Sequence, residues 1–195
     1  MVHYYHYAGI SDFRIGELNV NGLNSQNKQL ALKIHCDFFD VEIMVLIDTR
    51  LNEETARLLE NNWDNRYWIH SLGINTGNGI GRGIFIGILK TSPVTIYDKL
   101  KVKNGNMLLI NFSRDSRTFC LACIYGPSSG DRPGFFECLF FKMASQICDH
   151  KLIVGDFNVA INHEIDTFNF TGVCCQNARA CLLEKNGGGW IYGYL

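Results

Sequence analysis

The sequence predicts an α/β fold, in which two mostly antiparallel β-sheets pack face to face as a sandwich and helices flank the outside. Two observations predict it. Strand and helix patterns alternate before residue 66, and after it short apolar runs follow one another, separated by Gly, Asn, Ser or Pro. With 195 residues, 47% of them hydrophobic, the chain is long enough to bury a substantial core as one domain.

The first two elements are a strand and a helix. Residues 13–20 have a strand pattern that breaks at Asn21 and Gly22, which together are a strong turn signal. Residues 25–40 follow as a helix, with Ser25 suited to the N-cap. Three apolar residues at helical spacing support this helix: Leu30, Ile34 and Phe38.

A buried strand and a second short helix come next. Residues 41–47 form a continuous apolar run that ends in the charged residues around Asp48, and residues 52–62 have a helical pattern. This alternation of strand and helix is typical of a sheet that is covered by helices.

From residue 66 the apolar period becomes that of strands, and the runs predict an antiparallel meander. The five strand-like runs are residues 66–72, 83–90, 94–102, 107–113 and 118–126. Residues 131–150 return to a helix, opened by Pro133, and residues 151–158 form one more buried strand.

The pattern weakens after about residue 166. Residues 176–189 are long enough for two helical turns before three glycines, and residues 190–195 are expected to end the chain without closing a sheet. We therefore predict a partial domain over residues 10–183, cut short at its C-terminus. Irregular ends are expected over the remaining residues, 1–9 and 184–195.

Two features that suggest a ligand site have structural explanations. Cys120 and Cys123 lie inside a strand-like run, where a spacing of three directs the two sulfurs to opposite faces of the sheet. Most of the eight cysteines are expected to be buried thiols. The glycine-rich segment 73–83 lacks the spacing of a phosphate-binding loop, and we interpret it as a hairpin loop.

Bulk charge and hydropathy restrict the functional classes. The formal net charge is −1, so no overall basic field indicates a nucleic-acid partner. No apolar run approaches the roughly 20 residues of a membrane span, and the N-terminus lacks a signal-peptide pattern. We expect a soluble intracellular protein with no membrane partner and no small-molecule cofactor. The sequence makes no prediction of the oligomeric state.

Polar residues follow several of the predicted strands. They are Asn19, Asn21, Asp48, Tyr125, Asp156 and Asn158. Each has a structural alternative, since Asn-Gly makes turns, Asp48 could cap the following helix, and a Tyr at a strand end often belongs to the core. Together, at one edge of a sandwich, they offer carboxylates for a hard cation such as Mg²⁺ and amide donors for phosphate oxygens. This combination is what metal-assisted phosphodiester hydrolysis requires.

Four motifs carry a family resemblance. They are "LNVNGLN" at 18–24, "IDTRL" at 47–51, "IYGPSSGDRPGFF" at 124–136 and "GDFNVAINHEID" at 155–166. In this order they resemble the endonuclease/exonuclease/phosphatase superfamily, which has the DNase I-like fold. Within it, they are most similar to the apurinic-type endonuclease domain of non-LTR (LINE-like) retrotransposons.

The resemblance implies a Mg²⁺-dependent endonuclease acting on DNA, with Mn²⁺ as an alternative cation, and a nuclear location for that work. Asp156 would activate the attacking water, and Asn158 would help bind the transition state. Asn19 would orient the catalytic carboxylate or contact the scissile phosphate, and Tyr125 would lie against the phosphate. Two residues would serve the metal: Asp48 as a ligand and Asn21 close to it.

The chain departs from the family pattern in two places. Asp48 stands where the family has Glu, beside Arg50 in place of His, and the family's final Asp-His pair lies beyond the matched region. We interpret His150 and His163 as surface histidines. These departures leave two alternatives open: an inert retrotransposon remnant that binds nucleic acid or protein weakly, and a phosphoesterase acting on a nucleotide or lipid phosphoester.

Overall fold

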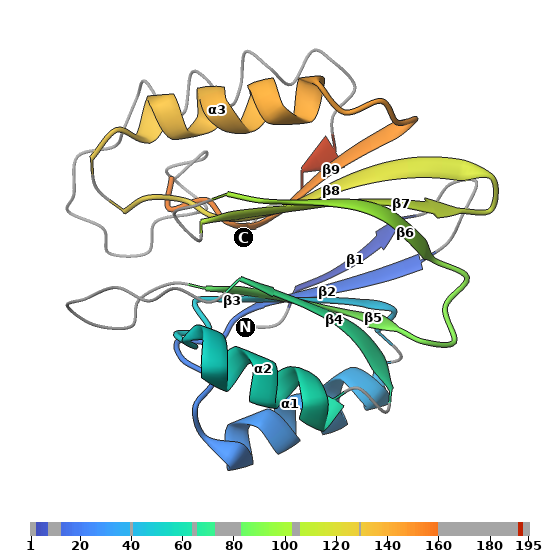
Figure 1. Ribbon diagram of the computed structural model, residues 1–195, viewed down its shortest axis with the longest axis vertical. Helices are drawn as coiled ribbons and strands as arrows, with labels where there is room; N and C mark the ends of the chain where they lie inside the picture. The colour runs from blue at the N-terminus through green and yellow to red at the C-terminus, as the bar shows by residue number, and fades with distance from the viewer. Residues whose placement is uncertain are drawn as a thin grey trace.

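Two five-stranded sheets pack face to face in the computed structural model of the chain (Figure 1). The structure describes residues 3–7, 13–39, 41–63, 66–72, 83–102, 106–128, 130–159 and 191–192. The first sheet has the order β1 (His3–Tyr7), β2 (Phe13–Asn19), β3 (Ile43–Ile47), β5 (Ile84–Leu89) and β4 (Tyr67–Leu72). The second has the order β10 (Ile191–Tyr192), β9 (His150–Asp156), β8 (Arg117–Tyr125), β7 (Met107–Arg114) and β6 (Thr95–Lys101).

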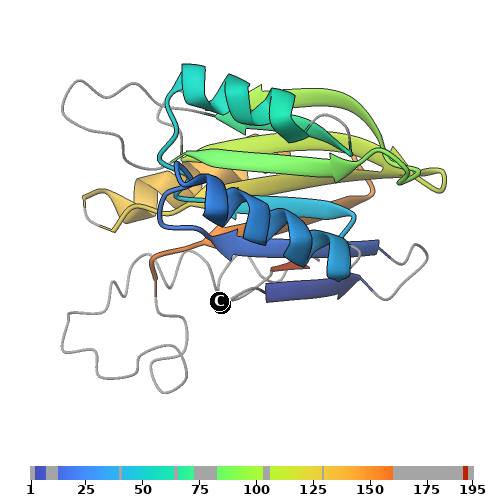
Figure 2. The same cartoon turned by 90° about the horizontal axis from the view of Figure 1, so that it is seen from below.

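Helices cover the outer face of each sheet, so the molecule has four layers (Figures 1 and 2). The first sheet carries α1 (Gln26–Phe38) and α2 (Glu53–Trp63), and the second carries α3 (Arg132–Ala144). This arrangement confirms the predicted sandwich with flanking helices. None of the helices in the described ranges is long and apolar enough to span a membrane.

The main core lies between the two sheets and follows from the period-2 alternation of the strands. Inward-facing residues include Phe13 and Ile15 of β2, Val45 of β3, and Leu121 of β8. The opposite faces of the same strands pack against the helices, as Met44 does against the helices of the first sheet. Each central strand is therefore apolar on both faces, which explains its unbroken apolar sequence.

Two parallel strand pairs place the C-terminal ends of four strands together. β2 is parallel to β3, with α1 as the connection, and β8 is parallel to β9, with α3 as the connection. Strands that run in the same direction end at the same edge of their sheet. The polar residues that follow these four strands are consequently gathered at one end of the sandwich.

The predicted meander is wrong as a single unit. β4 pairs antiparallel with β5, and β6, β7 and β8 form a continuous antiparallel ladder. Between β5 and β6, however, the chain passes from the first sheet to the second. Turn residues mark the end of a strand but do not indicate which sheet the next strand joins, so the sequence pattern is the same in both cases.

The two ends of the chain also differ from the prediction. β1 lies within the segment expected to be irregular and pairs antiparallel with β2 along the edge of the first sheet. At the other end, β10 pairs parallel with β9, with Ile191 opposite Leu152. The segment expected to pair with nothing therefore contributes an edge strand.

The apolar residues that predicted α1 do not face the core. Leu30, Ile34 and Phe38 are 60%, 59% and 80% exposed, whereas Leu32 and Cys36 are buried against the first sheet. Both sets have a spacing of four residues, so helical periodicity alone identified the helix without identifying its buried face. Ser25 occupies the predicted N-cap position, although its side chain makes no capping hydrogen bond to the described residues of the helix.

Candidate active site

Asn19 and Asp156 join the two sheets at the polar end of the sandwich. Asn19 ends β2, Asp156 ends β9, and the Asn19 Nδ2 donates a hydrogen bond of 3.0 Å to Asp156 Oδ2. The other carboxylate oxygen, Oδ1, accepts a hydrogen bond of 2.9 Å from the backbone N–H of Asn158. The carboxylate is thus fixed from both sides, by one donor from each sheet.

Tyr125 and Asn158 lie next to Asp156 in the second sheet. Tyr125 is the register partner of Asp156 across the β8–β9 pair and is partly buried against the inter-sheet core. Asn158 has a left-handed backbone, with φ of 50°, and its Nδ2 donates to the carbonyl of Gly126 at 2.7 Å. The Gly126 N–H in turn donates to the backbone carbonyl of Asp156 at 2.6 Å.

Asn21 lies in the turn that follows β2, close to Asn19. Its backbone N–H donates to Asn19 Oδ1 at 3.1 Å, and its φ of 44° suits the left-handed conformation that Asn tolerates. Lys28, which the sequence analysis did not identify, holds this turn from α1. Its ammonium group donates to the backbone carbonyls of Val20 and Gly22. The turn is therefore fixed by Asn19 on one side and by Lys28 on the other.

Asp48 is buried, 5% exposed, and is held by a neighbouring cation. Its carboxylate accepts hydrogen bonds from Arg50, at 2.8 Å from Nη2 and 3.2 Å from Nε. These hydrogen bonds and the negative charge of Asp48 raise the pKa of Arg50. The alternative that Asp48 caps the next helix is wrong, because Asn52 Oδ1 accepts the capping bond from the Thr55 N–H at 2.8 Å.

Glu17 is a further carboxylate at this site and was not predicted. It is 0% exposed, and neither of its carboxylate oxygens has a hydrogen-bond partner among the described residues. Burial, and secondly the negative charge of Asp156, raise the pKa of Glu17 to about 7. The signal was present in the sequence, since Glu17 has the same strand parity as the inward-facing Phe13 and Ile15.

The oxygen donors at this end of the sandwich fit a hard divalent cation. Within the described ranges, no group of three or more His, Cys, Asp or Glu side chains forms a ready metal cage. Mg²⁺ does not need one, because it commonly binds one or two carboxylates and completes its coordination with water and substrate. The unpartnered carboxylate of Glu17 is a buried group that a cation would satisfy, whereas the charge of Asp48 is already balanced by Arg50.

The other candidate ligands lie elsewhere. Cys120 packs toward α3 and Cys123 toward the inter-sheet core, which confirms that the two sulfurs face opposite sides of the sheet. Burial raises the pKa of Cys120 to about 12, so its thiol stays protonated. His150 is half-buried rather than on the surface, stacks on Phe119 at 5.0 Å, and begins the strand that Asp156 ends. His163 and residues 73–82 lie outside the described ranges.

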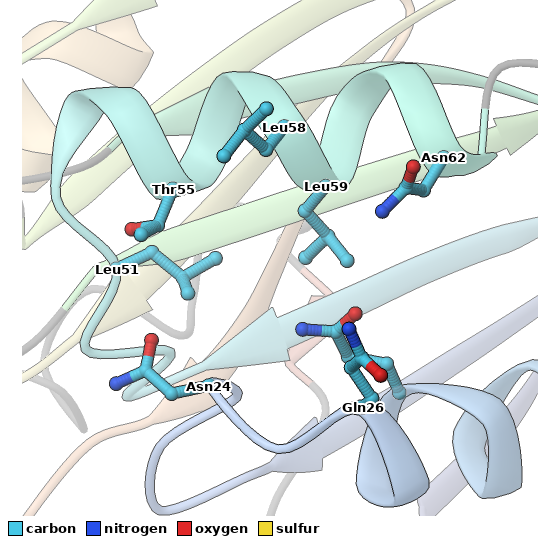
Figure 3. A pocket seen from close by; sticks show the side chains of 8 residues that line it. Asn24, Gln26, Leu51, Thr55, Leu58, Leu59 and Asn62 are labelled. Carbon is cyan, nitrogen blue, oxygen red and sulfur yellow. The ribbon is translucent and has the colours of Figure 1, made fainter.

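A pocket between α1 and α2 is separate from the predicted site residues (Figure 3). Side-chain amides and aliphatic groups line it: Asn24, Gln26, Gln29, Leu51, Thr55, Leu58, Leu59 and Asn62. Asn24 and Leu51 belong to the loops that follow β2 and β3, whereas the other six come from the two helices. None of the six predicted site residues contributes to it.

No family model matches the chain, and comparison with solved structures identifies the fold. The catalytic domain of Xenopus laevis APE2 superposes with a TM-score of 0.66 at 14% identity, over 88% of this chain and 67% of that one. The endonuclease domain of TRAS1, a telomere-specific non-LTR retrotransposon, gives a TM-score of 0.59 at 11% identity, over 88% of this chain and 70% of that one. The chain has the DNase I-like fold.

A third structure with the DNase I-like fold was solved with nucleic acid. Danio rerio TDP2, in complex with a single-strand DNA product, gives a TM-score of 0.56 at 16% identity, over 77% of this chain and 62% of that one. At these identities the similarity establishes the architecture, which is the DNase I-like sandwich predicted from the four motifs. The function depends on the site itself.

Proposed function

We propose that the chain hydrolyses phosphodiester bonds in DNA with a divalent cation, Mg²⁺ or Mn²⁺, as a retrotransposon-type endonuclease. The observation that carries this proposal is the hydrogen bond from Asn19 to Asp156, which unites the two sheets at the strand ends. It fixes a carboxylate beside Tyr125 and Asn158, the side chains expected to meet a phosphate.

Asp156 is the proposed general base. Each of its oxygens accepts one N–H bond, and each retains a further lone pair that a water molecule can use. In the reaction the water oxygen forms a bond to phosphorus while the bond to the leaving oxygen breaks, and the water proton passes to Asp156. Because Asn19 and the Asn158 backbone hold the carboxylate, it needs no reorganisation to accept that proton.

The neighbouring polar groups are proposed to bind the phosphate. Amide N–H groups of Asn19 and Asn158 and the phenol of Tyr125 are neutral donors that stabilise developing negative charge on phosphate oxygens. Asn21, beside Asn19, is proposed to lie close to the cation. When bound, the cation would polarise a phosphate oxygen and offset negative charge in the transition state.

The choice of DNA as substrate is supported by the neighbours of the fold. One is an endonuclease domain from a retrotransposon, and another was crystallised with a single-strand DNA product. The four sequence motifs point to the same class. Acting on chromosomal DNA, the protein would work in the nucleus.

A plasmid nicking assay tests the proposal. Purified protein should convert supercoiled DNA to the open circle in Mg²⁺ and not in EDTA. Asp156→Asn keeps the shape of the side chain but removes the base, so we expect the nicking rate to fall by about 10² to 10⁴. Asp115→Asn, an exposed site at the opposite end of the sandwich, is the matched control and should nick like the wild type.

A second candidate is a protein that binds DNA without cutting it. The ion pair between Arg50 and Asp48 favours this second candidate, because the charge of the carboxylate predicted to bind the metal is already balanced by the arginine. Folded protein that shifts labelled DNA in a mobility assay yet leaves supercoiled plasmid intact in both Mg²⁺ and Mn²⁺ would support this alternative over hydrolysis.

A further inference from the structure

We propose that Glu17, rather than Asp48, is the carboxylate that binds the divalent cation at this site. The inference rests on the proposed function, because the cation is the one that the hydrolysis requires. It concerns a residue outside the four motifs, and it follows from the contacts that the two carboxylates make and fail to make.

Asp48 already forms an ion pair with Arg50. Arg50 donates from Nε to Oδ1 at 3.2 Å and from Nη2 to Oδ2 at 2.8 Å, the side-on geometry that a guanidinium and a carboxylate prefer. The side chain of Asp48 is 7% exposed while that of Arg50 is 45% exposed, so the arginine covers the carboxylate from the solvent side. A metal ion could reach Asp48 only by displacing this cation.

Glu17 has the opposite character. It precedes Asn19 by two residues on β2, so its side chain emerges on the same face of the strand, toward the second sheet. Burial is the main cause that raises the pKa of Glu17, and the negative charge of Asp156 is the second. The two carboxylates therefore interact electrostatically. A buried carboxylate without a hydrogen-bond partner in the described part of the chain is costly, and a bound cation is one of the few groups that would satisfy both oxygens.

The surroundings of Glu17 select the class of cation. The neighbouring charge that acts on Glu17 is the carboxylate of Asp156, and hard cations such as Mg²⁺ and Mn²⁺ prefer oxygen ligands. The negative charge of Glu17 also acts on Cys123, whose pKa is raised well above its usual value by burial and then by Glu17. A protonated thiol is a poor metal ligand, so a soft or thiolate-seeking ion is disfavoured.

Binding of Mn²⁺, followed by electron paramagnetic resonance, tests the assignment without any measure of activity. Free Mn²⁺ gives a strong signal that is lost on binding, and Mg²⁺ should compete. We expect Glu17→Gln to weaken Mn²⁺ binding by about 10-fold or more. Asp48→Asn should leave the affinity close to that of the wild type. Glu54→Gln, an exposed glutamate on α2, is the matched control and should have no effect.

Folding of the variants is checked by circular dichroism and thermal unfolding. Mn²⁺ should raise the Tm of the wild type and should not raise that of Glu17→Gln. If Glu17→Gln does not fold, Glu17→Met offers a side chain of similar volume without oxygens, and it too should show no Mn²⁺-dependent rise. Failure of both variants to fold would assign Glu17 a structural role and would overturn the proposal.

The outcomes separate this inference from the proposed function. Mn²⁺ that binds through Glu17 to a protein unable to nick DNA supports the inference and contradicts the hydrolysis. Nicking by a protein whose Mn²⁺ affinity is unchanged in Glu17→Gln, or is lost in Asp48→Asn alone, supports the hydrolysis and overturns the inference. A wild-type protein that binds no Mn²⁺ at millimolar concentrations also overturns it.

Discussion

Gly155 controls how closely β9 approaches its neighbours just before Asp156. Its φ is 134°, a conformation that residues with a side chain rarely adopt. A Cβ atom there would lie 2.0 Å from the carbonyl oxygen of Ile124 and 2.8 Å from the Cδ1 of Ile47. Only glycine allows the strand to pass between these two residues, so it also determines where Asp156 lies.

Gly155→Ala is therefore expected to lower the free energy of unfolding by about 2 to 4 kcal/mol and to reduce nicking, measured by urea denaturation and by the plasmid assay. Gly130→Ala is the matched control, since Gly130 has φ of 84° but its added Cβ would meet no atom of the described residues within 4 Å. Gly130→Ala should lower the free energy of unfolding by only about 1 kcal/mol, because of backbone strain. Equal losses in the two variants would show that the close contacts of Gly155 do not matter.

Glu17 makes the stability of the metal-free protein depend on pH. Its pKa is about 7 in the folded protein and 4.5 ordinarily, so between these values the folded state holds a proton that the unfolded chain has released. The free energy of unfolding should consequently fall as the pH rises from 4.5 to about 7, by at most about 3 kcal/mol, and then level off. Urea denaturation in EDTA should show this decline in the wild type and a shallower profile in Glu17→Gln. If the unfolding free energies of the wild type and Glu17→Gln changed with pH in parallel, Glu17 would not be the source of the pH dependence.

At the scale of the element, α1 has two apolar stripes of which only one is buried. Leu32 lies in the core that covers the first sheet, and Ile34 is exposed to solvent. Leu32→Ala should cost about 2 to 4 kcal/mol of unfolding free energy, and Ile34→Ala less than about 0.5 kcal/mol. Urea denaturation of the two variants measures this difference, and the reverse order of losses would mean that the helix packs by its other stripe.

Local sequence patterns account for most elements and for the polar strand ends, because strand and helix periods depend on burial along one segment. They do not determine contacts between distant segments. The passage from β5 to β6 between sheets and the buried face of α1 depend on how the sheets dock, which no single period records. Asn19 and Asp156 meet at the predicted edge of the sandwich. Strand parity indicates that Glu17 is buried, but only the folded structure shows that its carboxylate has no hydrogen-bond partner among the described residues. The local pairing of Arg50 with Asp48 depends on a left-handed backbone at both residues, which no helix or strand period predicts.

At the scale of the whole molecule, a partly buried ion pair joins the sheets at the end opposite Asn19 and Asp156. Arg114 ends β7, and its guanidinium binds the carboxylate of Glu42, which precedes β3. The two side chains are 11% and 17% exposed. The same guanidinium lies 5.4 Å from the centre of the Phe13 ring. The sandwich is thus held by polar contacts at both ends, with the apolar core between them.

Arg114→Met is expected to lower the free energy of unfolding by about 3 kcal/mol, because it leaves the Glu42 carboxylate without its charged partner. Adding Glu42→Gln should recover part of the loss, since the isolated charge is then removed. A double-mutant cycle by urea denaturation measures the coupling. Strictly additive losses would show that the pair contributes nothing to the joining of the sheets.

Each sheet is built almost entirely from one continuous part of the chain, the first before residue 90 and the second after residue 94. During synthesis, the strands of the first sheet leave the ribosome before those of the second. Until then its inner face, with Glu17 among Phe13 and Ile15, remains in water, where the carboxylate is ionised at no cost. Asn19 therefore emerges before Asp156, and the site forms only when the second sheet packs against the first.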